Sequence, residues 1–211
     1  GMWLLVDMAG VNVFHLLQAA FSPIAKVAQT WYGMVILLFI EAFVYSMGIS
    51  CWVMSPITNP ILTMAIVANI EMARNGVTDV ALLNLYTQAT IYCAYYAFGG
   101  IGNTLALNLM SLRSKSNKIK GLSRASIAPS IFNINEPIVF GMIAWNPFLM
   151  VPMWLNGIIT PLLMWLFTKI IPFAPIPVTD FSGFWCMPFP FVTWLGTQSL
   201  NAVILMLGLF V

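Results

Sequence analysis

The sequence predicts an all-α, polytopic integral membrane protein, and three observations lead to this fold class. Hydrophobic residues make up 61% of the 211 residues and charged residues only 7%, with a mean hydropathy of +0.93, whereas soluble domains carry about 45–50% and about 25%. Apolar runs recur along the whole chain, so a cleaved signal peptide does not explain them. Aromatic residues reach 14% and include eight tryptophans, a residue type that anchors proteins at bilayer interfaces.

The first element expected is an amphipathic helix within residues 1–30, which we separate from the apolar remainder, residues 31–211. Apolar side chains recur every three or four positions, and polar ones, His15 among them, fill the opposite face. Such a helix would lie in the membrane interface or beneath a helix bundle, with a break at Ser22-Pro23. We interpret His15, the only histidine, as a solvated surface residue.

Residues 31–50 form the next expected element, a helix long enough to cross the roughly 30 Å of bilayer hydrocarbon. It contains one acid, Glu41. A carboxylate inside the membrane is a candidate functional group, but Glu41 could equally pair with a neighbouring helix, and both interpretations stay open. In residues 54–79 an apolar piece of about a dozen residues follows two prolines, so we expect a re-entrant segment or a half-helix there.

Residues 113–124 carry five of the eight basic residues and no acid. A short basic stretch between apolar segments lies on the cytoplasmic side of a membrane under the positive-inside rule. Topology explains these charges more simply than a nucleic-acid or lipid patch, so we predict a cytoplasmic loop and no nucleic-acid partner. The basic residues are Arg113, Lys115, Lys118, Lys120 and Arg124.

The apolar sequence on both sides of this stretch is interrupted by glycines and prolines. The run "FGGIGNT", residues 98–104, is neither a phosphate loop nor a dinucleotide fingerprint. Its glycines indicate close backbone approach, to a helix or to a ligand, and the sequence leaves these two open. Broken helices line protein-enclosed cavities because backbone groups exposed to lipid cost several kcal/mol each. Half-helices that meet near the midplane are how many transporters build a substrate site.

The run "IFNINEPIVFG", residues 131–141, places polar residues inside an apolar region. Proline favours the first helical position, so Glu136 should stand just outside a helix that begins near Pro137. The helix dipole contributes about 0.3–1 kcal/mol, and up to about 2 kcal/mol when partly buried, against a cost of about 2.5–3.5 kcal/mol for an acid at the bilayer centre. A further hydrogen-bonding partner is therefore needed.

Two interpretations of this run follow. Glu136 lies twelve residues after Arg124, about 18 Å if the chain is helical, which is near the middle of the bilayer. Together with Asn133 and Asn135 it suits a ligand rich in hydroxyl groups, which need both donors and acceptors. The alternative is an acid that only caps a half-helix and pairs with one of the two asparagines. We favour ligand binding.

The sequence lacks the motifs of self-contained catalysis. It has no zinc-ligand cluster, no HExxH and no GxSxG, and its single histidine makes a Ser-His-Asp site improbable. Cys51, Cys93 and Cys186 form no CxxC, so we expect small core residues rather than a disulfide framework. We expect no metal and no cofactor.

These motifs resemble the membrane-embedded IIC component of the lactose/cellobiose/diacetylchitobiose family of the bacterial phosphotransferase system. The family carries a nearly identical Asn-Ile-Asn-Glu-Pro run after a basic cytoplasmic loop, and "NPFLMVPM", "FGGIGNTLAL" and "GFWCMPFP" continue the resemblance. The resemblance covers essentially the whole chain, as the C-terminal part of a longer protein. The chain opens directly on apolar sequence and ends without a polar flank, so we expect that an N-terminal part is absent.

The resemblance implies transmembrane helices and two re-entrant hairpins that enclose one disaccharide of the cellobiose, chitobiose or lactose type. Residues 31–211 would be the substrate-binding transport domain, multi-pass in a bacterial cell membrane. Glu136 would bind sugar hydroxyls and could aid their deprotonation, and Trp185 would contact the sugar or, alternatively, anchor the membrane interface. The implied substrate-binding residues are Ser50, Gly99, Gly100, Gly102, Asn103, Asn133, Asn135, Glu136 and Trp185.

The implied mechanism is group translocation. A separate IIB subunit at the cytoplasmic face would phosphorylate the sugar from a phosphocysteine, and the full-length protein would be a homodimer. One departure concerns the family's Gly-Ile-His-Gly, matched here by Gly48-Ile49-Ser50-Cys51, because serine cannot carry a proton near neutral pH as imidazole can. The alternatives are an ion-coupled secondary transporter and a divergent membrane protein that no longer transports.

Overall fold

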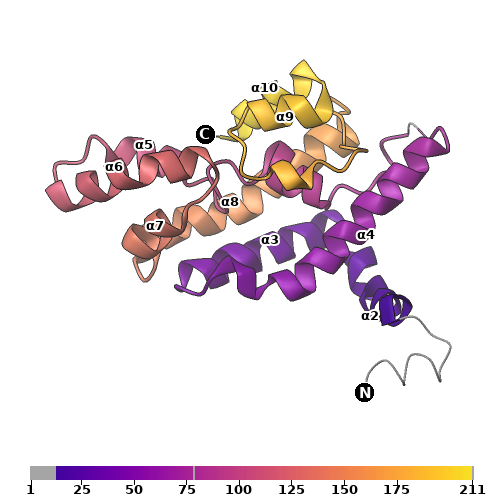
Figure 1. Cartoon of the computed structure of the whole chain (residues 1–211), viewed down its shortest axis with the longest axis horizontal. Coiled ribbons are helices and arrows are strands. Elements are labelled where there is room, and N and C mark those ends of the chain that lie inside the picture. Colours follow the sequence, from indigo (N-terminus) through magenta and orange to yellow (C-terminus); the bar gives the residue numbers. More distant parts are fainter. Residues whose placement is uncertain (1–12, 78, 211) are drawn as a thin grey trace.

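The computed structural model describes residues 13–77 and 79–210, with side chains from Phe21 onward. In this part of the chain every regular element is helical, as predicted (Figure 1). Residues 1–12 of the expected amphipathic helix, and the side chain of His15, lie outside the described set. The α-helices are α2 (Val13–Ala28), α3 (Trp31–Ser46), α4 (Ser55–Arg74), α5 (Leu105–Ser111), α6 (Asn117–Ile131), α7 (Glu136–Ile138), α8 (Pro147–Trp165), α9 (Phe191–Thr197) and α10 (Leu200–Leu209).

Short 3-10 and π-helical pieces connect or extend these helices. They are η1 (Cys51–Val53), η2 (Ala89–Tyr95), η3 (Val139–Ile143), η4 (Leu166–Ile170) and η5 (Ser182–Phe184). Helix α3 packs along α8, α2 packs on α4, and α5 and α6 form a hairpin at one end of the molecule (Figure 1). Helices α9 and α10 cover η2, so η2 lies in the interior.

The break between α2 and α3 is not where we predicted it. Helix α2 continues through Pro23 to Ala28, and a bend of 102° follows between Phe21–Ala28 and Trp31–Ser46. Thr30 starts the new helix because its hydroxyl accepts a hydrogen bond from the Gly33 N–H at 3.1 Å. The carbonyl of Val27 fills the space that a Cβ at Gly33 would need. Capping and close approach therefore fix the bend, whereas the proline only removes one N–H donor.

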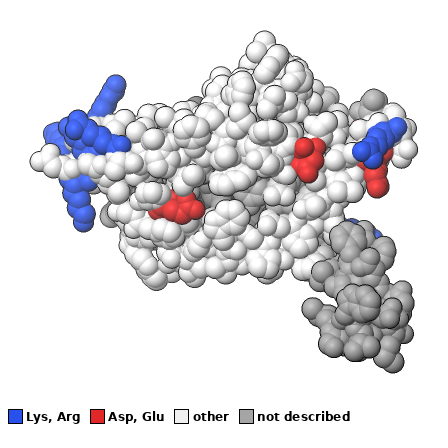
Figure 2. All heavy atoms as spheres, in the orientation of Figure 1, with Lys and Arg blue, Asp and Glu red and all other residues white. Residues whose placement is uncertain are grey.

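Two further elements differ from the sequence-based expectation. Helix α4 is one continuous helix of 20 residues through Pro60, about 30 Å long, so the predicted half-helix is wrong, and the alternative, a re-entrant segment, stays a prediction. The predicted loop 113–124 is irregular only as far as Ser116, whose side chain caps α6 at Asn117. Figure 2 shows lysines and arginines gathered at the α5–α6 end of the molecule.

One helix among the described residues, Pro147–Ile170, is by itself long and apolar enough to cross a membrane. The bent pair Phe21–Ala28 and Trp31–Ser46 meets the same criterion only when taken together. Leu200–Leu209 is apolar but shorter.

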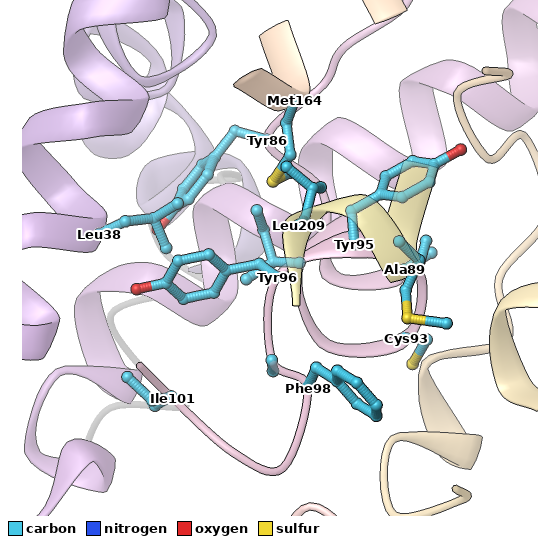
Figure 3. Packing of buried hydrophobic residues seen from close by; sticks show 14 of the residues in the cluster. Leu38, Tyr86, Ala89, Cys93, Tyr95, Tyr96, Phe98, Ile101, Met164 and Leu209 are labelled. Atoms are coloured by element: carbon cyan, nitrogen blue, oxygen red, sulfur yellow. The ribbon is translucent and has the colours of Figure 1, made fainter. Parts of the chain in front are cut away.

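The core is built around the irregular segment from residue 86 to residue 98. Tyr86, Tyr95 and Tyr96 are almost completely buried, and in Figure 3 the neighbouring rings of Tyr95 and Tyr96 point in opposite directions from this segment. The hydroxyl of Tyr95 donates to the Pro175 carbonyl at 2.6 Å. Cys93 is buried, as predicted for a small core residue, whereas Cys51 and Cys186 are only half-buried, so the prediction is wrong for these two.

Amide side chains form hydrogen bonds with backbone N–H and C=O groups that have no partner within a helix. The Gln29 amide donates to the Tyr86 carbonyl at 2.8 Å and accepts from the Tyr86 N–H at 2.9 Å. In the same way, the Asn69 amide donates to the Asn84 carbonyl at 2.8 Å and accepts from the Asn84 N–H at 2.7 Å. We call such contacts amide bridges. They supply the hydrogen bonds that an irregular segment would otherwise lack in apolar surroundings.

Lys169, in η4, supplies a charged counterpart to these bridges. Its ammonium donates to the carbonyls of Val80, Ala81 and Leu83. We expect Lys169→Met to lower the stability of the full-length protein in detergent by about 1–3 kcal/mol, because three carbonyls lose a charged donor and water replaces it only in part. The change should appear as a lower melting temperature, with faster proteolysis near residues 80–83.

Lys118→Met is the control for this prediction, since Lys118 is exposed at the α5–α6 end. Equal melting temperatures for the two variants would contradict a stabilising role of the Lys169 contacts.

Candidate functional site

A partly open cavity with an interior volume of about 130 Å³ lies where the broken segments meet. Polar side chains and two tryptophans line it, and its described lining contains two carboxylates but no lysine, arginine or histidine. The lining residues are Glu41, Cys51, Trp52, Ser55, Asn59, Gln88, Tyr92, Ala97, Gly100, Ile101, Asn133, Asn135, Glu136 and Trp185.

Glu136 reaches the cavity from the turn between α6 and α7. Helix α6 ends at Ile131, Asn133 adopts a left-handed conformation with φ of 63°, and Glu136 is the first residue of α7. The helix thus begins one residue earlier than predicted, and the Glu136 side chain is half-buried. A carboxylate at this position is favoured by the free N–H groups of the helix start.

Asn133 joins three segments that are distant in sequence. Its Oδ1 accepts from the Gly99 N–H at 3.0 Å, and its Nδ2 donates to the carbonyls of Trp185 at 2.8 Å and Met187 at 2.9 Å. The side chain is 7% exposed. Both N–H donors of the amide are therefore used within the protein.

The side-chain amide of Asn135 is also fully hydrogen-bonded within the protein. Its Oδ1 accepts from the Tyr45 hydroxyl at 3.0 Å, and its Nδ2 donates to the Ile101 carbonyl and to Thr104 Oγ1, both at 2.9 Å. Neither asparagine is paired with Glu136, so the alternative in which Glu136 is held by an asparagine amide finds no contact of that kind among the described residues. The two side chains fix the turn that carries Glu136.

The glycine run, residues 98–104, lies beside this turn, and the groups that approach its backbone closely belong to the protein. A Cβ at Gly100 would lie 2.5 Å from Asn135 Oδ1 and 2.6 Å from Nδ2, and Gly100 also lines the cavity. A Cβ at Gly99 would overlap Leu105, and one at Gly102 would meet Met153 of α8. Asn103 accepts from the Phe98 N–H at 3.2 Å and donates to the Leu209 carbonyl at 3.3 Å.

Trp185 lies at the cavity with an aromatic partner that the sequence analysis did not identify. Its ring lies 6.2 Å from that of Trp52, centroid to centroid, in an edge-to-face arrangement of 78°. The two side chains are 38% and 58% exposed, so both offer apolar ring surface to a ligand. Trp185 follows the short turn η5, and Trp52 lies in η1.

Ser50 precedes η1 and is absent from the described cavity lining. Its hydroxyl accepts from the Trp52 N–H at 3.4 Å, so Ser50 caps the turn that carries Trp52. The next two residues, Cys51 and Trp52, do line the cavity. Ser50 itself therefore lies next to the lining rather than in it.

The sequence analysis also missed Ser55, Asn59, Gln88 and Tyr92, and it left Glu41 open. Asn59 and Gln88 are amides within apolar runs, and that pattern is the signal that could have identified them. Glu41 Oε1 accepts from the Tyr92 hydroxyl at 3.0 Å. No group of three or more histidine, cysteine, aspartate or glutamate side chains placed to hold a metal ion occurs within residues 13–77 and 79–210.

Comparisons with known proteins agree with one another. The family "Phosphotransferase system, EIIC" matches residues 2–157. The chain is 36% identical over 165 residues to a putative permease IIC component, YwbA, of Bacillus subtilis, covering 76% of this chain and 35% of the relative. It is 32% identical over 151 residues to the cellobiose-specific EIIC component of Geobacillus stearothermophilus, covering 69% of this chain and 33% of that protein.

The fold has a match among solved structures. The crystal structure of the transporter ChbC, the IIC component from the N,N'-diacetylchitobiose-specific phosphotransferase system, is similar with a TM-score of 0.81 and 26% identity. The match covers 99% of this chain and 49% of that one. The chain thus spans about a third of the length of these curated relatives and about half of the solved structure.

Proposed function

The chain belongs to the EIIC family of the phosphotransferase system, of the lactose/cellobiose/diacetylchitobiose type, and from this we propose that it forms the sugar-binding part of a membrane permease. The permease carries a disaccharide across the bacterial membrane, and a separate IIB subunit phosphorylates the sugar at the cytoplasmic face. The family is membrane-embedded, and the all-helical fold agrees with it.

One observation carries the proposal: Glu136 and the Trp52–Trp185 pair line the same cavity. A carboxylate accepts hydrogen bonds from sugar hydroxyls, and tryptophan rings supply flat apolar surface for a pyranose. The amides of Asn59 and Gln88, in the same lining, add both donors and acceptors. A hydroxyl-rich ligand with apolar ring faces matches this combination.

In this proposal Asn133 and Asn135 position the site rather than bind the sugar, because their N–H donors are bound within the protein. They hold Glu136 and the glycine run in place. In the phosphorylation step a sugar oxygen forms a bond to phosphorus while the phosphorus–sulfur bond of the IIB phosphocysteine breaks. Glu136 receives the proton that the sugar hydroxyl gives up.

The test is equilibrium binding of a labelled panel (cellobiose, diacetylchitobiose and lactose) to the full-length protein in detergent, beside its Glu136→Gln variant. We expect at least one sugar to bind and the variant to bind it at least about tenfold more weakly. The reason is that hydrogen bonds to charged groups contribute about 1.5–3 kcal/mol, against about 0.5–1.5 kcal/mol for neutral ones.

Glu71→Gln, at an exposed position of α4, is the matched control and should bind like the unsubstituted protein. Binding of no sugar by the unsubstituted protein would contradict the proposed function. Uptake driven by a proton or sodium gradient, rather than by phosphoenolpyruvate, would identify an ion-coupled transporter instead. Full phosphorylation by Glu136→Gln at saturating sugar would exclude the proton-accepting role of Glu136.

A further inference from the structure

Glu41 is the second carboxylate of the cavity, and the proposed function does not use it. It comes from α3, on another wall of the cavity than the α7 turn that carries Glu136. Its side chain is only 3% exposed. An acid at such a position inside an apolar helix is costly unless its oxygens are bound.

The two oxygens of Glu41 differ in their surroundings. Oε1 accepts from the Tyr92 hydroxyl at 3.0 Å, so one side of the carboxylate is fixed. Oε2 is buried and has no hydrogen-bond partner among the described residues. Leaving a buried acceptor unsatisfied costs about 1–3 kcal/mol, and more for a charged group, so a partner from outside the described residues is indicated.

The cavity determines what kind of partner fits. Its described lining offers no cationic side chain to Glu41, and an ionised carboxylate only accepts hydrogen bonds. A ligand that brings a hydrogen-bond donor satisfies Oε2. A sugar carries several hydroxyl donors around its rings, so one sugar can donate to more than one carboxylate of a cavity.

We propose that Glu41 is a second substrate-binding carboxylate, oriented by Tyr92, whose Oε2 accepts a hydrogen bond from a sugar hydroxyl other than the one bound by Glu136. This inference rests on the proposed function, since it assigns a further contact to the same sugar. Glu41 thereby contributes to the choice among disaccharides, while Glu136 lies beside the hydroxyl that is phosphorylated. Tyr92 is a positioning residue.

The experiment measures affinities of the full-length protein in detergent for the best-binding disaccharide and for its series of monodeoxy analogues. The variants are Glu41→Gln, Tyr92→Phe, Glu136→Gln and the surface control Glu71→Gln. We expect Glu41→Gln to bind the parent sugar about tenfold more weakly, because a charged hydrogen bond becomes a neutral one. Tyr92→Phe keeps the carboxylate but loses its orientation, and we expect a weakening of about threefold.

The deoxy series separates contact from structural damage. One analogue should bind the unsubstituted protein weakly, and the Glu41→Gln substitution should not lower its affinity any further. A different analogue should behave in this way with Glu136→Gln. A Glu41→Gln variant with unchanged affinity, or with the same losses across all analogues as the unsubstituted protein, would overturn the inference while leaving the proposed function intact.

Two other outcomes are informative. Sugar affinity that rises with sodium concentration, and loses this dependence in Glu41→Gln, would overturn the inference in favour of a cation bound at Glu41. Absence of binding of any sugar by the unsubstituted protein would overturn the proposed function, and this inference with it.

Discussion

Alanine in place of Gly100 is expected to abolish measurable sugar binding and to lower stability by about 3–5 kcal/mol. Gly100 has a φ of 91°, and a side chain in a left-handed conformation costs about 1–2 kcal/mol. In addition, the new Cβ would lie 2.5 Å from Asn135 Oδ1 and 2.6 Å from Nδ2. Asn135 cannot give way without losing contacts to Tyr45, Ile101 and Thr104, each about 0.5–1.5 kcal/mol.

Gly76 provides a matched control for this substitution. It has a similar φ of 77°, and a Cβ there would meet nothing within 4 Å. Gly76→Ala therefore introduces the backbone strain without the clash, and we expect a loss of only about 1–2 kcal/mol with unchanged sugar binding. Melting temperatures and binding of both variants, measured on the full-length protein in detergent, would refute the steric argument if the two substitutions behaved alike.

Removal of the Asn133 side chain is expected to have an effect of similar size. Asn133→Gly tolerates the φ of 63°, so the result reports the side chain rather than the backbone. The Gly99 N–H and the carbonyls of Trp185 and Met187 each lose a partner, at about 1–3 kcal/mol for each buried group. We expect a loss of at least about 3 kcal/mol and sugar affinity reduced by at least about tenfold.

Two companion variants sharpen this result. Asn133→Asp should be as damaging as glycine, because a carboxylate has no N–H to offer to the two carbonyls. Asn75→Gly, at the exposed end of α4, should be close to neutral. Normal stability of Asn133→Asp would show that the bonds to Trp185 and Met187 contribute little.

The sequence was sufficient for the fold class and for the place of Glu136 at the cavity, because polar residues inside an apolar region stand out against their surroundings. It was not sufficient for the rest of the lining. Trp52 lies in η1, Asn59 in α4, and Gln88 and Tyr92 at the start of and within η2, and their convergence depends on how η1, α4 and η2 pack.

The asparagines illustrate a second limit. Asn133 and Asn135 were recognised as unusual residues, but a sequence does not tell which backbone groups are left unpaired by broken helices. Their N–H donors are in fact bound to such groups and to Thr104. The break at Ser22-Pro23 was predicted wrongly for a similar reason, since the bend is fixed by contacts of Thr30 and Gly33 with the preceding helix end.

The amide contacts of the site also set the order in which it can assemble during synthesis. Asn133 binds backbone 52 and 54 positions later in the chain, and Asn103 binds the carbonyl of Leu209, 106 positions later. At about 5–20 residues per second, the ribosome needs roughly 3–10 s to proceed from Asn133 to Trp185. During that interval the turn that carries Glu136 has been synthesised together with its earlier partners, whereas Trp185 and Met187 have not, so the cavity is completed only after these later segments are translated.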